Sequence, residues 1–280
     1  MDLPKQTLLA FAIASLMALR GYKRKSLSSN GAVAAWIVGF CSIFCGMRGF
    51  LLLLFYLIGT KATKYKAKFK SKLEEIDASC RGPSQVLACS VVGICIQTIH
   101  FIYCGKERSM DFKESQLASS LTCALIAHHA TNLADTLSSE LGILSKSDPI
   151  LITSLRRVPR GTNGGISLTG IGCSILGGSL IGSGAYLIDT LSGLDANPLA
   201  CILFGIVFGT TGSIIDSFLG ATLQVTYFDE EKKVISSNST KEGNVKWIAG
   251  MDRISNTQVN LVSVMITSAL GFYFGPSFFR

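Results

Sequence analysis

The sequence has few charged residues for a chain of its length. Of its 280 residues, 16% are Asp, Glu, Lys or Arg, whereas soluble globular proteins have about 25%. Hydrophobic residues make up 48% of the chain, and the mean hydropathy is +0.43. So apolar a chain is not disordered, because it has ample hydrophobic surface to bury. The shortage of charge excludes an ordinary soluble protein and predicts an integral membrane protein.

Two further patterns are missing. The net charge is +8, but the basic residues form no continuous stripe of the kind that binds nucleic acid. The cysteines number nine, which is odd, and most lie in apolar runs, where a thiol behaves as a small hydrophobic group. They predict neither a disulfide framework nor a metal site, and we expect no nucleic-acid partner.

Long apolar runs are what the sequence has instead. A helix needs about 20 residues to cross a bilayer, and the apolar runs predict an all-α fold, a polytopic membrane bundle of seven or eight spans. We expect a single membrane domain over residues 1–280. The second and third spans are short and flank Arg48, so a re-entrant pair is the alternative there. The spans are predicted at residues 4–20, 31–47, 49–60, 85–104, 117–134, 165–191, 199–220 and 257–277.

The basic residues predict which side of the membrane each loop faces. If the N-terminus is outside and eight spans alternate, 20 of the 26 Lys and Arg residues fall on one side, as in cytosolic loops. Asn238 begins a glycosylation sequon on that side, which we interpret as unused. The opposite loops are short, and Asp189 is expected there as a solvated residue at a helix end. The cytosolic loops are predicted to be 20–30, 61–84, 135–164 and 221–256.

Two acidic residues, Asp135 and Asp216, lie near the cytosolic ends of predicted spans. An intramembrane carboxylate needs a polar cavity or a partner, and two acids at one depth repel unless a metal or base is shared. Mg²⁺ prefers carboxylate and phosphate oxygens. We therefore predict that Asp135 and Asp216 hold Mg²⁺, with Glu140 as a third ligand.

Basic and glycine-rich segments are expected at the same face. A glycine-rich turn before a helix presents backbone N–H groups to phosphate, so the segment after Arg160 predicts a phosphate-binding loop made of Thr162, Asn163, Gly164 and Gly165. Lys61 and Lys64 stand against the membrane and are predicted as further phosphate contacts. The lysines that follow them are expected to meet anionic lipid headgroups.

Four ordered strings lie at this face: Lys-Arg-Lys-Ser-Leu at 23–27, Ala-Asp-Thr-Leu-Ser-Ser-Glu-Leu-Gly at 134–142, Pro-Arg-Gly-Thr-Asn-Gly-Gly at 159–165 and Gly-Ser-Ile-Ile-Asp-Ser-Phe-Leu-Gly-Ala-Thr-Leu-Gln at 212–224. They resemble the transmembrane protein 19 family of polytopic membrane proteins over nearly the whole chain. The resemblance implies an all-helical membrane protein. The same wider family includes the plastid phytyl-phosphate kinase. The chain departs from the family pattern at Arg81-Gly82-Pro83 and at Ala88-Cys89-Ser90.

These features predict a membrane-embedded kinase that transfers a phosphoryl group from CTP or ATP to a prenyl monophosphate. The acceptor needs no strong base, since the second pKa of a phosphate monoester is about 6. Asp135, Asp216 and Arg160 would hold the phosphates in line, with the lipid tail between spans and lined by the glycine-faced spans 165–191 and 199–220. No transit-type leader precedes the first span, so we expect a multi-pass endomembrane protein, in the endoplasmic reticulum rather than the plastid.

Two other classes of function remain alternatives. Ion-coupled or lipid transporters also combine intramembrane acids with glycine-broken helices. In a transporter, polar residues are expected to continue to the opposite face, whereas the sequence places them near one side. A non-catalytic membrane signalling protein would use its glycines for packing alone and would tolerate Asp135→Asn.

Overall fold

The computed structural model describes residues 3–73, 80–236 and 245–279, and 68% of these residues are helical. The helices are α1 (Leu3–Lys23), α2 (Ser29–Cys45), η1 (Met47–Gly49), α3 (Phe50–Lys64), α4 (Ala67–Lys70), α5 (Pro83–Ala88), α6 (Val91–Cys104), α7 (Gln116–Gly142), α8 (Leu168–Leu191), α9 (Pro198–Leu223), α10 (Asn256–Phe274) and η2 (Gly275–Ser277). The strands are β1 (Ile150–Leu151), β2 (Gly165–Ile166), β3 (Thr226–Asp229), β4 (Val234–Ser236) and β5 (Val245–Ala249).

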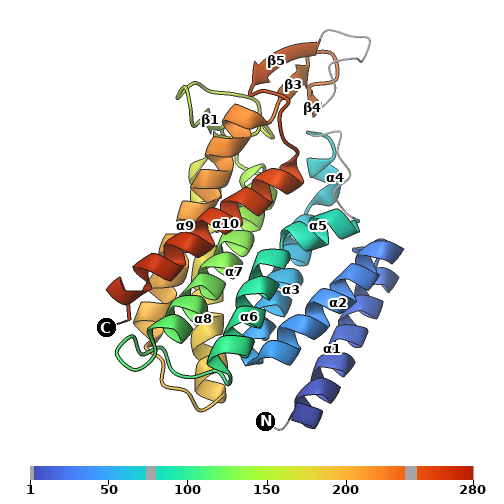
Figure 1. Ribbon diagram of the computed structural model, residues 1–280. Coiled ribbons are helices and arrows are strands. Elements are labelled where there is room, and N and C mark those ends of the chain that lie inside the picture. Colours follow the sequence, from blue (N-terminus) through green and yellow to red (C-terminus); the bar gives the residue numbers. More distant parts are fainter. Residues whose placement is uncertain (1–2, 74–79, 237–244, 280) are drawn as a thin grey trace.

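The long helices run side by side in alternating directions (Figure 1). The predicted spans each correspond to a helix, except that 85–104 is broken into α5 and α6. Three helices are long and apolar enough to cross a membrane, namely Leu168–Leu191, Pro198–Leu223 and Asn256–Ser277. The helical membrane bundle is thus confirmed, while the number of seven or eight spans stays a prediction.

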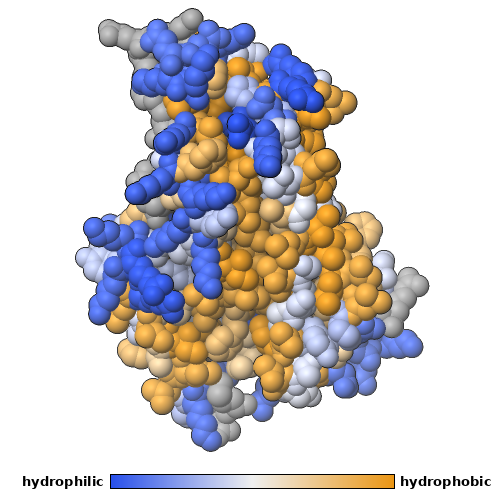
Figure 2. Space-filling model, turned by 180° about the vertical axis from the view of Figure 1, so that it is seen from behind, coloured by the Kyte–Doolittle hydropathy of each residue, from blue (hydrophilic) through white to orange (hydrophobic). Residues whose placement is uncertain are grey.

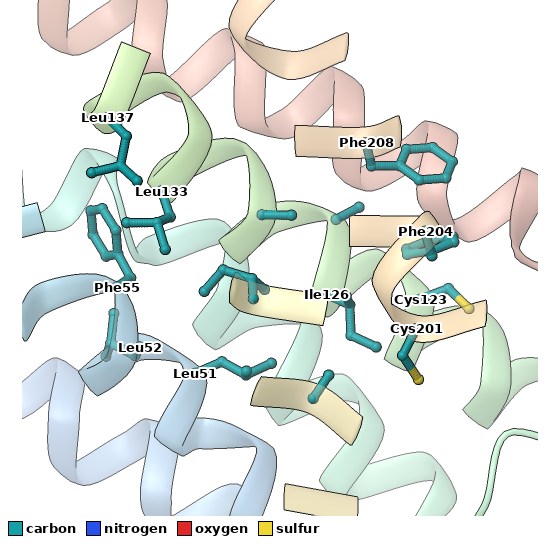
Figure 3. Packing of buried hydrophobic residues seen from close by; sticks show 14 of the residues in the cluster. Leu51, Leu52, Phe55, Cys123, Ile126, Leu133, Leu137, Cys201, Phe204 and Phe208 are labelled. Carbon is teal, nitrogen blue, oxygen red and sulfur yellow. The ribbon is translucent and has the colours of Figure 1, made fainter. Parts of the chain in front are cut away.

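Helix α7 is the central helix of the bundle. It packs against α3, α6, α8, α9 and α10, and its residues from Ala118 to Ala134 are all buried. Figure 3 shows the core around it, with Leu133 and Leu137 toward Phe55 of α3 and Cys123 beside Phe204 of α9. The neighbouring helices therefore shield this part of α7 from lipid.

Glycines bring α8 and α9 into backbone contact. A Cβ added to Gly178 would lie 2.3 Å from the Gly205 oxygen, and one added to Gly182 would lie 2.3 Å from the Cys201 oxygen. Such small residues let membrane helices approach closely. These glycines therefore do not line a lipid tail as predicted, because they face the backbone of the neighbouring helix.

Polar caps define where several helices begin. The Ser28 side chain accepts a bond from the Gly31 N–H, and the Ser167 side chain accepts one from Gly170. Asn197 caps α9 just before a proline, and Ser255 forms a capping box with Gln258 at the start of α10. These side chains satisfy N–H groups that the first turn of a helix leaves unpaired.

The structure departs from a purely helical fold in two small antiparallel sheets. Strands β1 and β2 pair in one, and the order in the other is β4-β3-β5. The second sheet contains Val, Thr, Tyr, Phe and Trp, the residue types that favour strands. The hydropathy pattern missed these strands because they are short and lie in a region predicted only as a loop.

The strands and the basic loops lie at one end of the bundle, and both chain ends lie toward the other (Figure 1). Figure 2 shows a broad apolar surface across the centre and right of the molecule, with hydrophilic residues at the top, along the left side to about mid-height and at the bottom. Such an arrangement suits a protein whose middle lies in hydrocarbon. That the strand-bearing end faces the cytosol stays a prediction, and Asn238 lies outside the described residues.

Candidate functional site

The site begins with two carboxylates from different helices, Asp135 on α7 and Asp216 on α9. They are close enough to interact electrostatically. Ser213 Oγ lies 3.5 Å from Asp135 Oδ1, and Ser263 Oγ donates to Asp216 Oδ2 at 3.2 Å. The amide of Asn260, oriented to suit its neighbours, donates to Asp216 Oδ2 at 3.1 Å. Residues far apart in sequence thus form one polar cluster between α7, α9 and α10.

The charge of this pair is not neutralised within the described residues. No Lys, Arg or His nitrogen of those residues lies within 4.0 Å of either carboxylate. The donors that reach the pair are hydroxyls and an amide, which are neutral. Both aspartates are only partly buried, so the pair remains open to a ligand. Two like charges held together favour binding of a cation.

Glu140 does not join the two aspartates. Its carboxylate pairs with Lys70 Nζ, and Lys70 also donates to the carbonyl oxygens of Ala62 at 3.1 Å and Thr63 at 2.7 Å. Within the described part of the chain, no three His, Cys, Asp or Glu residues are grouped so as to hold a metal ion. The acidic cluster therefore contains two carboxylates, and we leave Glu140 out of it.

The glycine-rich loop after Arg160 packs against α9. Thr162 N–H donates to Pro159 O at 3.2 Å, Gly165 N–H to Thr162 O at 2.9 Å, and Asn163 N–H to Thr226 Oγ1 at 3.2 Å. Gly164 has a φ of +74°, and a Cβ there would lie 2.3 Å from Ala221 Cβ. Three backbone donors of the predicted phosphate loop are thus engaged within the protein, and the phosphate role stays a prediction.

Of the basic residues predicted to contact phosphate, Arg160 and Lys64 donate hydrogen bonds to backbone carbonyl oxygens, and Lys61 is exposed. Arg160 Nη1 donates to Ser145 O at 3.0 Å, and its Nε lies 3.9 Å from Asp148 Oδ1. Lys64 Nζ donates to Arg24 O at 2.8 Å. Lys61 is exposed on the last turn of α3. These residues lie at the same end of the bundle as the aspartates, and their phosphate contacts stay predictions.

Arg81, a basic residue that the sequence did not single out, approaches the turn of α7 that carries Asp135. A Cβ on Gly59 would lie 3.4 Å from the methyl of Thr136, which follows Asp135, and 3.6 Å from Arg81 Nη2. The sequence signal for Arg81 is weak, because it stands where the chain departs from the family pattern.

Polar residues on the buried part of α7 mainly join helices. Thr131 Oγ1 donates to Phe208 O at 3.2 Å and to Thr267 Oγ1 at 2.9 Å. Asn132 Nδ2 donates to Cys89 O at 3.1 Å, the same carbonyl that lies 3.1 Å from His128 Nε2. Interhelical hydrogen bonds of this kind hold membrane helices together. Thr131 and Asn132 therefore have a structural role.

A second charged cluster occupies the opposite end of the bundle. Arg48, 1% exposed, donates from Nε to Asp189 Oδ1 at 2.8 Å and from Nη2 to Asp189 Oδ2 at 3.0 Å. Its Nη1 donates to Thr122 Oγ1 at 3.0 Å. Glu107 accepts the Met47 and Arg48 N–H groups at 2.8 and 3.0 Å, and burial raises the pKa of its carboxyl despite the nearby guanidinium.

The expectation that Asp189 is solvated is wrong. Asp189 is 0% exposed, because α8 carries it into the interior opposite η1, where it meets Arg48. A sequence signal was available: one arginine and one acid stand in otherwise apolar stretches on the same predicted side of the membrane, and such residues commonly pair.

The fold and both clusters define a polytopic helical membrane protein with an uncompensated acidic site at one end. Residues 12–268 match the family described as integral membrane protein DUF92, and the chain belongs to this family. The family resemblance seen in the sequence strings is thereby confirmed. No solved structure matches the chain.

Alignments with relatives cover most of the chain. It is 36% identical to Protein PGR of Arabidopsis thaliana, over 96% of this chain and 97% of the relative. It is 30% identical to the uncharacterized membrane protein MJ0933 of Methanocaldococcus jannaschii, over 76% and 81%. It is 26% identical to Protein VTE6, chloroplastic, of Arabidopsis thaliana, over 93% and 67%. This last name lends no support to a location in the endoplasmic reticulum rather than the plastid.

Proposed function

We propose that the chain is a membrane-embedded kinase that transfers a phosphoryl group from a nucleoside triphosphate, CTP or ATP, to an isoprenoid monophosphate. One observation carries the proposal: Asp135 and Asp216 lie together, and within the described residues only neutral groups bond to them. The resemblance to a family that includes the plastid phytyl-phosphate kinase supports the choice of reaction.

The pair fits Mg²⁺. Its ligating atoms are carboxylate oxygens from two rigid helices, and Mg²⁺ is commonly held by one or two carboxylates together with substrate phosphates and water. Two carboxylates without a third are therefore enough for this ion. When bound, Mg²⁺ would neutralise phosphate oxygens of both substrates. Asp135 and Asp216 are the residues that would hold it.

Phosphoryl transfer to a monophosphate requires the protein mainly to position the two substrates. An oxygen of the acceptor monophosphate attacks the γ-phosphorus, the bond from that phosphorus to the β–γ bridging oxygen breaks, and the nucleoside diphosphate leaves with the electron pair. The acceptor oxygen is already ionised at neutral pH, because the second pKa of a phosphate monoester is about 6. Catalysis is then mainly alignment and charge stabilisation.

Cations at the same end of the bundle would take part in that alignment. Arg81 approaches the turn of α7 that carries Asp135, and a guanidinium binds phosphate oxygens bidentately. Lys61, Lys64 and Arg160 lie at the same end, where they would attract the nucleotide. The loop of Thr162, Asn163, Gly164 and Gly165 would then act by supporting α9, which carries Asp216.

A transporter is the second candidate, and one observation favours it. The sequence placed polar residues near one face only, but Arg48 and Asp189 form a charged cluster at the other end. Buried polar side chains of α7, from Thr122 through His129 and Asn132, lie between that cluster and Asp135. Such a line of residues is typical of proton or ion pathways.

One experiment separates the candidates. Purified protein in liposomes is incubated with γ-labelled nucleotide, Mg²⁺ and a panel of prenyl monophosphates. We expect label in a prenyl diphosphate with the wild type and at least about a 100-fold loss with Asp135→Asn. Asp252→Asn, an exposed acid at the same end, is the matched control and should retain activity.

The outcomes are distinct. Ion or lipid flux without phosphoryl transfer would support the transporter and contradict the kinase. Full kinase activity in a folded Asp135→Asn protein would contradict the role of the aspartate pair. Neither flux nor transfer by the wild type would favour a non-catalytic signalling protein.

A further inference from the structure

An apolar pocket opens between two pairs of helices, α1 with α2 and α3 with α5. It has a cavity volume of about 70 Å³ and is partly open to solvent. Its walls come from α1, α2, α3 and α5, and they include Ala14, Ala18, Val38, Gly39, Leu52 and Phe55. Small residues of α1 and α2 leave this space open, in contrast to the closed glycine contact of α8 with α9.

The pocket is apolar along most of its wall and polar at one part. Arg81, Gln85 and Ser90 line it there. The backbone around Arg81 is fixed, since its N–H donates to Ser26 O at 3.0 Å and its carbonyl accepts the Ser28 N–H at 3.1 Å. A charged group is thus held at a defined place on an otherwise apolar cavity.

The guanidinium of Arg81 is positioned but not neutralised. Its carbon lies 5.9 Å from the centroid of the Phe55 ring, and Nη2 lies 3.4 Å from Thr63 Oγ1. Among the described residues, no carboxylate oxygen lies within 4.0 Å of it. An arginine that is not paired with a carboxylate and lies over an aromatic ring is well suited to a planar bidentate contact with phosphate.

The same guanidinium lies between the pocket and the turn of α7 that carries Asp135. Cys89 lines the pocket, and its carbonyl oxygen accepts a hydrogen bond from Asn132, three residues before Asp135 on α7. Gly59 separates Arg81 from Thr136, the residue after Asp135. A phosphate bound to Arg81 would therefore lie near the turn that carries Asp135, while anything attached to it would extend into the pocket.

We propose that this pocket binds the single apolar chain of an isoprenoid monophosphate and that Arg81 binds its phosphate. The assignment rests on the proposed kinase function and adds to it the place of the tail and the residue that recognises the head. The inner wall, at Gly39 and Leu52, then sets the longest chain that fits. The pocket between α1–α2 and α3–α5 thereby determines substrate length.

A pair of matched variants tests the length prediction. A Cβ at Gly39 would lie 3.7 Å from Ala14 Cβ, an ordinary contact, and Gly172 on exposed α8 has no atom within 4 Å of that position. In Gly39→Leu we expect activity with geranyl monophosphate to remain and activity with geranylgeranyl monophosphate to fall by about tenfold or more. Gly172→Leu should keep the wild-type length profile. An unchanged profile in Gly39→Leu would overturn the proposal.

The headgroup is tested separately. In Arg81→Gln we expect the KM for the monophosphate to rise by about tenfold or more, because a charge-assisted hydrogen bond is lost, while kcat changes less. Arg81→Lys keeps the charge but not the planar fork, so it should recover part of the loss. Equal KM values for wild type and Arg81→Gln would contradict the headgroup role.

A binding readout separates this inference from the kinase itself. A photoreactive benzophenone analogue of geranylgeranyl monophosphate is cross-linked without nucleotide, and the labelled peptides are mapped. We expect labelling of α2 and α5 in wild type and Gly172→Leu, and much weaker labelling in Gly39→Leu. If this labelling pattern appears but no prenyl phosphate is phosphorylated, the kinase proposal is contradicted and the proposal that the pocket binds an isoprenoid monophosphate is supported.

Two labelling outcomes would overturn the pocket whatever the kinase assay gives. One is labelling that is equal in wild type and Gly39→Leu. The other is loss of labelling on addition of diacyl phosphatidic acid vesicles, which would show that the site takes ordinary two-chain phospholipid instead of a single isoprenoid chain.

Discussion

The two ends of the bundle differ in whether their charged side chains are neutralised by a residue of opposite charge. At one end, Arg48 and Asp189 are buried together, and the arginine makes four hydrogen-bonding contacts through its guanidinium. At the other end, Asp135 and Asp216 repel each other and are bonded only by neutral groups within the described residues. The first cluster is complete without a ligand, whereas the second is not.

This difference separates structural from functional charge. Burying a charge is costly unless it is paired and hydrogen-bonded, and the Arg48 cluster meets both conditions, so it joins η1, α7 and α8. The aspartate pair is hydrogen-bonded by neutral groups but has no opposite charge within 4.0 Å among the described residues, and a protein retains such a pair when a ligand completes it. Helix α7 contacts both clusters, through Thr122 and through Asp135.

The largest effect on stability is expected at the compensated end. Asp189→Asn would leave the Arg48 charge buried without its partner, and breaking a buried pair costs about 3–5 kcal/mol. Thermal unfolding in detergent measures this loss. The double variant Arg48→Met with Asp189→Leu should regain most of it, because two apolar side chains remove both charges. A double variant as unstable as the single one would contradict this assignment.

Substitution in the aspartate pair should reduce phosphoryl transfer without reducing stability. Asp216→Asn relieves the repulsion of Asp135, so the unfolding midpoint without ligand should stay equal to that of the wild type or rise. Phosphoryl transfer should fall by at least about 100-fold in the same protein. A variant that loses stability and activity together would show that Asp216 is structural, like Asp189.

A smaller loss of stability is expected in the middle of α7, between the two ends of the bundle. Thr131→Val removes the hydrogen bonds to Phe208 O and Thr267 Oγ1, which should cost about 1 kcal/mol. Unfolding of the purified variant measures the loss, and phosphoryl transfer per folded molecule should be unchanged. A large loss of transfer in stably folded protein would instead place Thr131 in the functional site.

The smallest change in stability is expected on substitution of Glu140. Its pairing with Lys70 is partly exposed, and such pairs contribute about 0–1 kcal/mol. Glu140→Gln should therefore change the unfolding midpoint little and leave the Mg²⁺ dependence of transfer unaltered. A raised Mg²⁺ requirement would restore Glu140 to the metal site.

The sequence predicts the helices well because membrane spans are long and apolar, and Asp135 and Asp216 stand out as charges inside them. It missed the sheet from Thr226 to Ala249, which is set by short local pairing. It also missed the partners of Arg48 and Asp189, because such contacts depend on how helices rotate and pack. The place of Arg81 could not be predicted, because its position beside Phe55 and near the turn that carries Asp135 arises only from the fold.

Binding of Mn²⁺, a spectroscopic substitute for Mg²⁺, tests the central difference between the two ends most directly. The free Mn²⁺ signal is followed by electron paramagnetic resonance as protein in nanodiscs is titrated. We predict that the wild type and Asp252→Asn bind Mn²⁺ in competition with Mg²⁺ and that Asp135→Asn does not. Equal binding by wild type and Asp135→Asn, or no binding by the wild type, would contradict the assignment of the aspartate pair as a cation site.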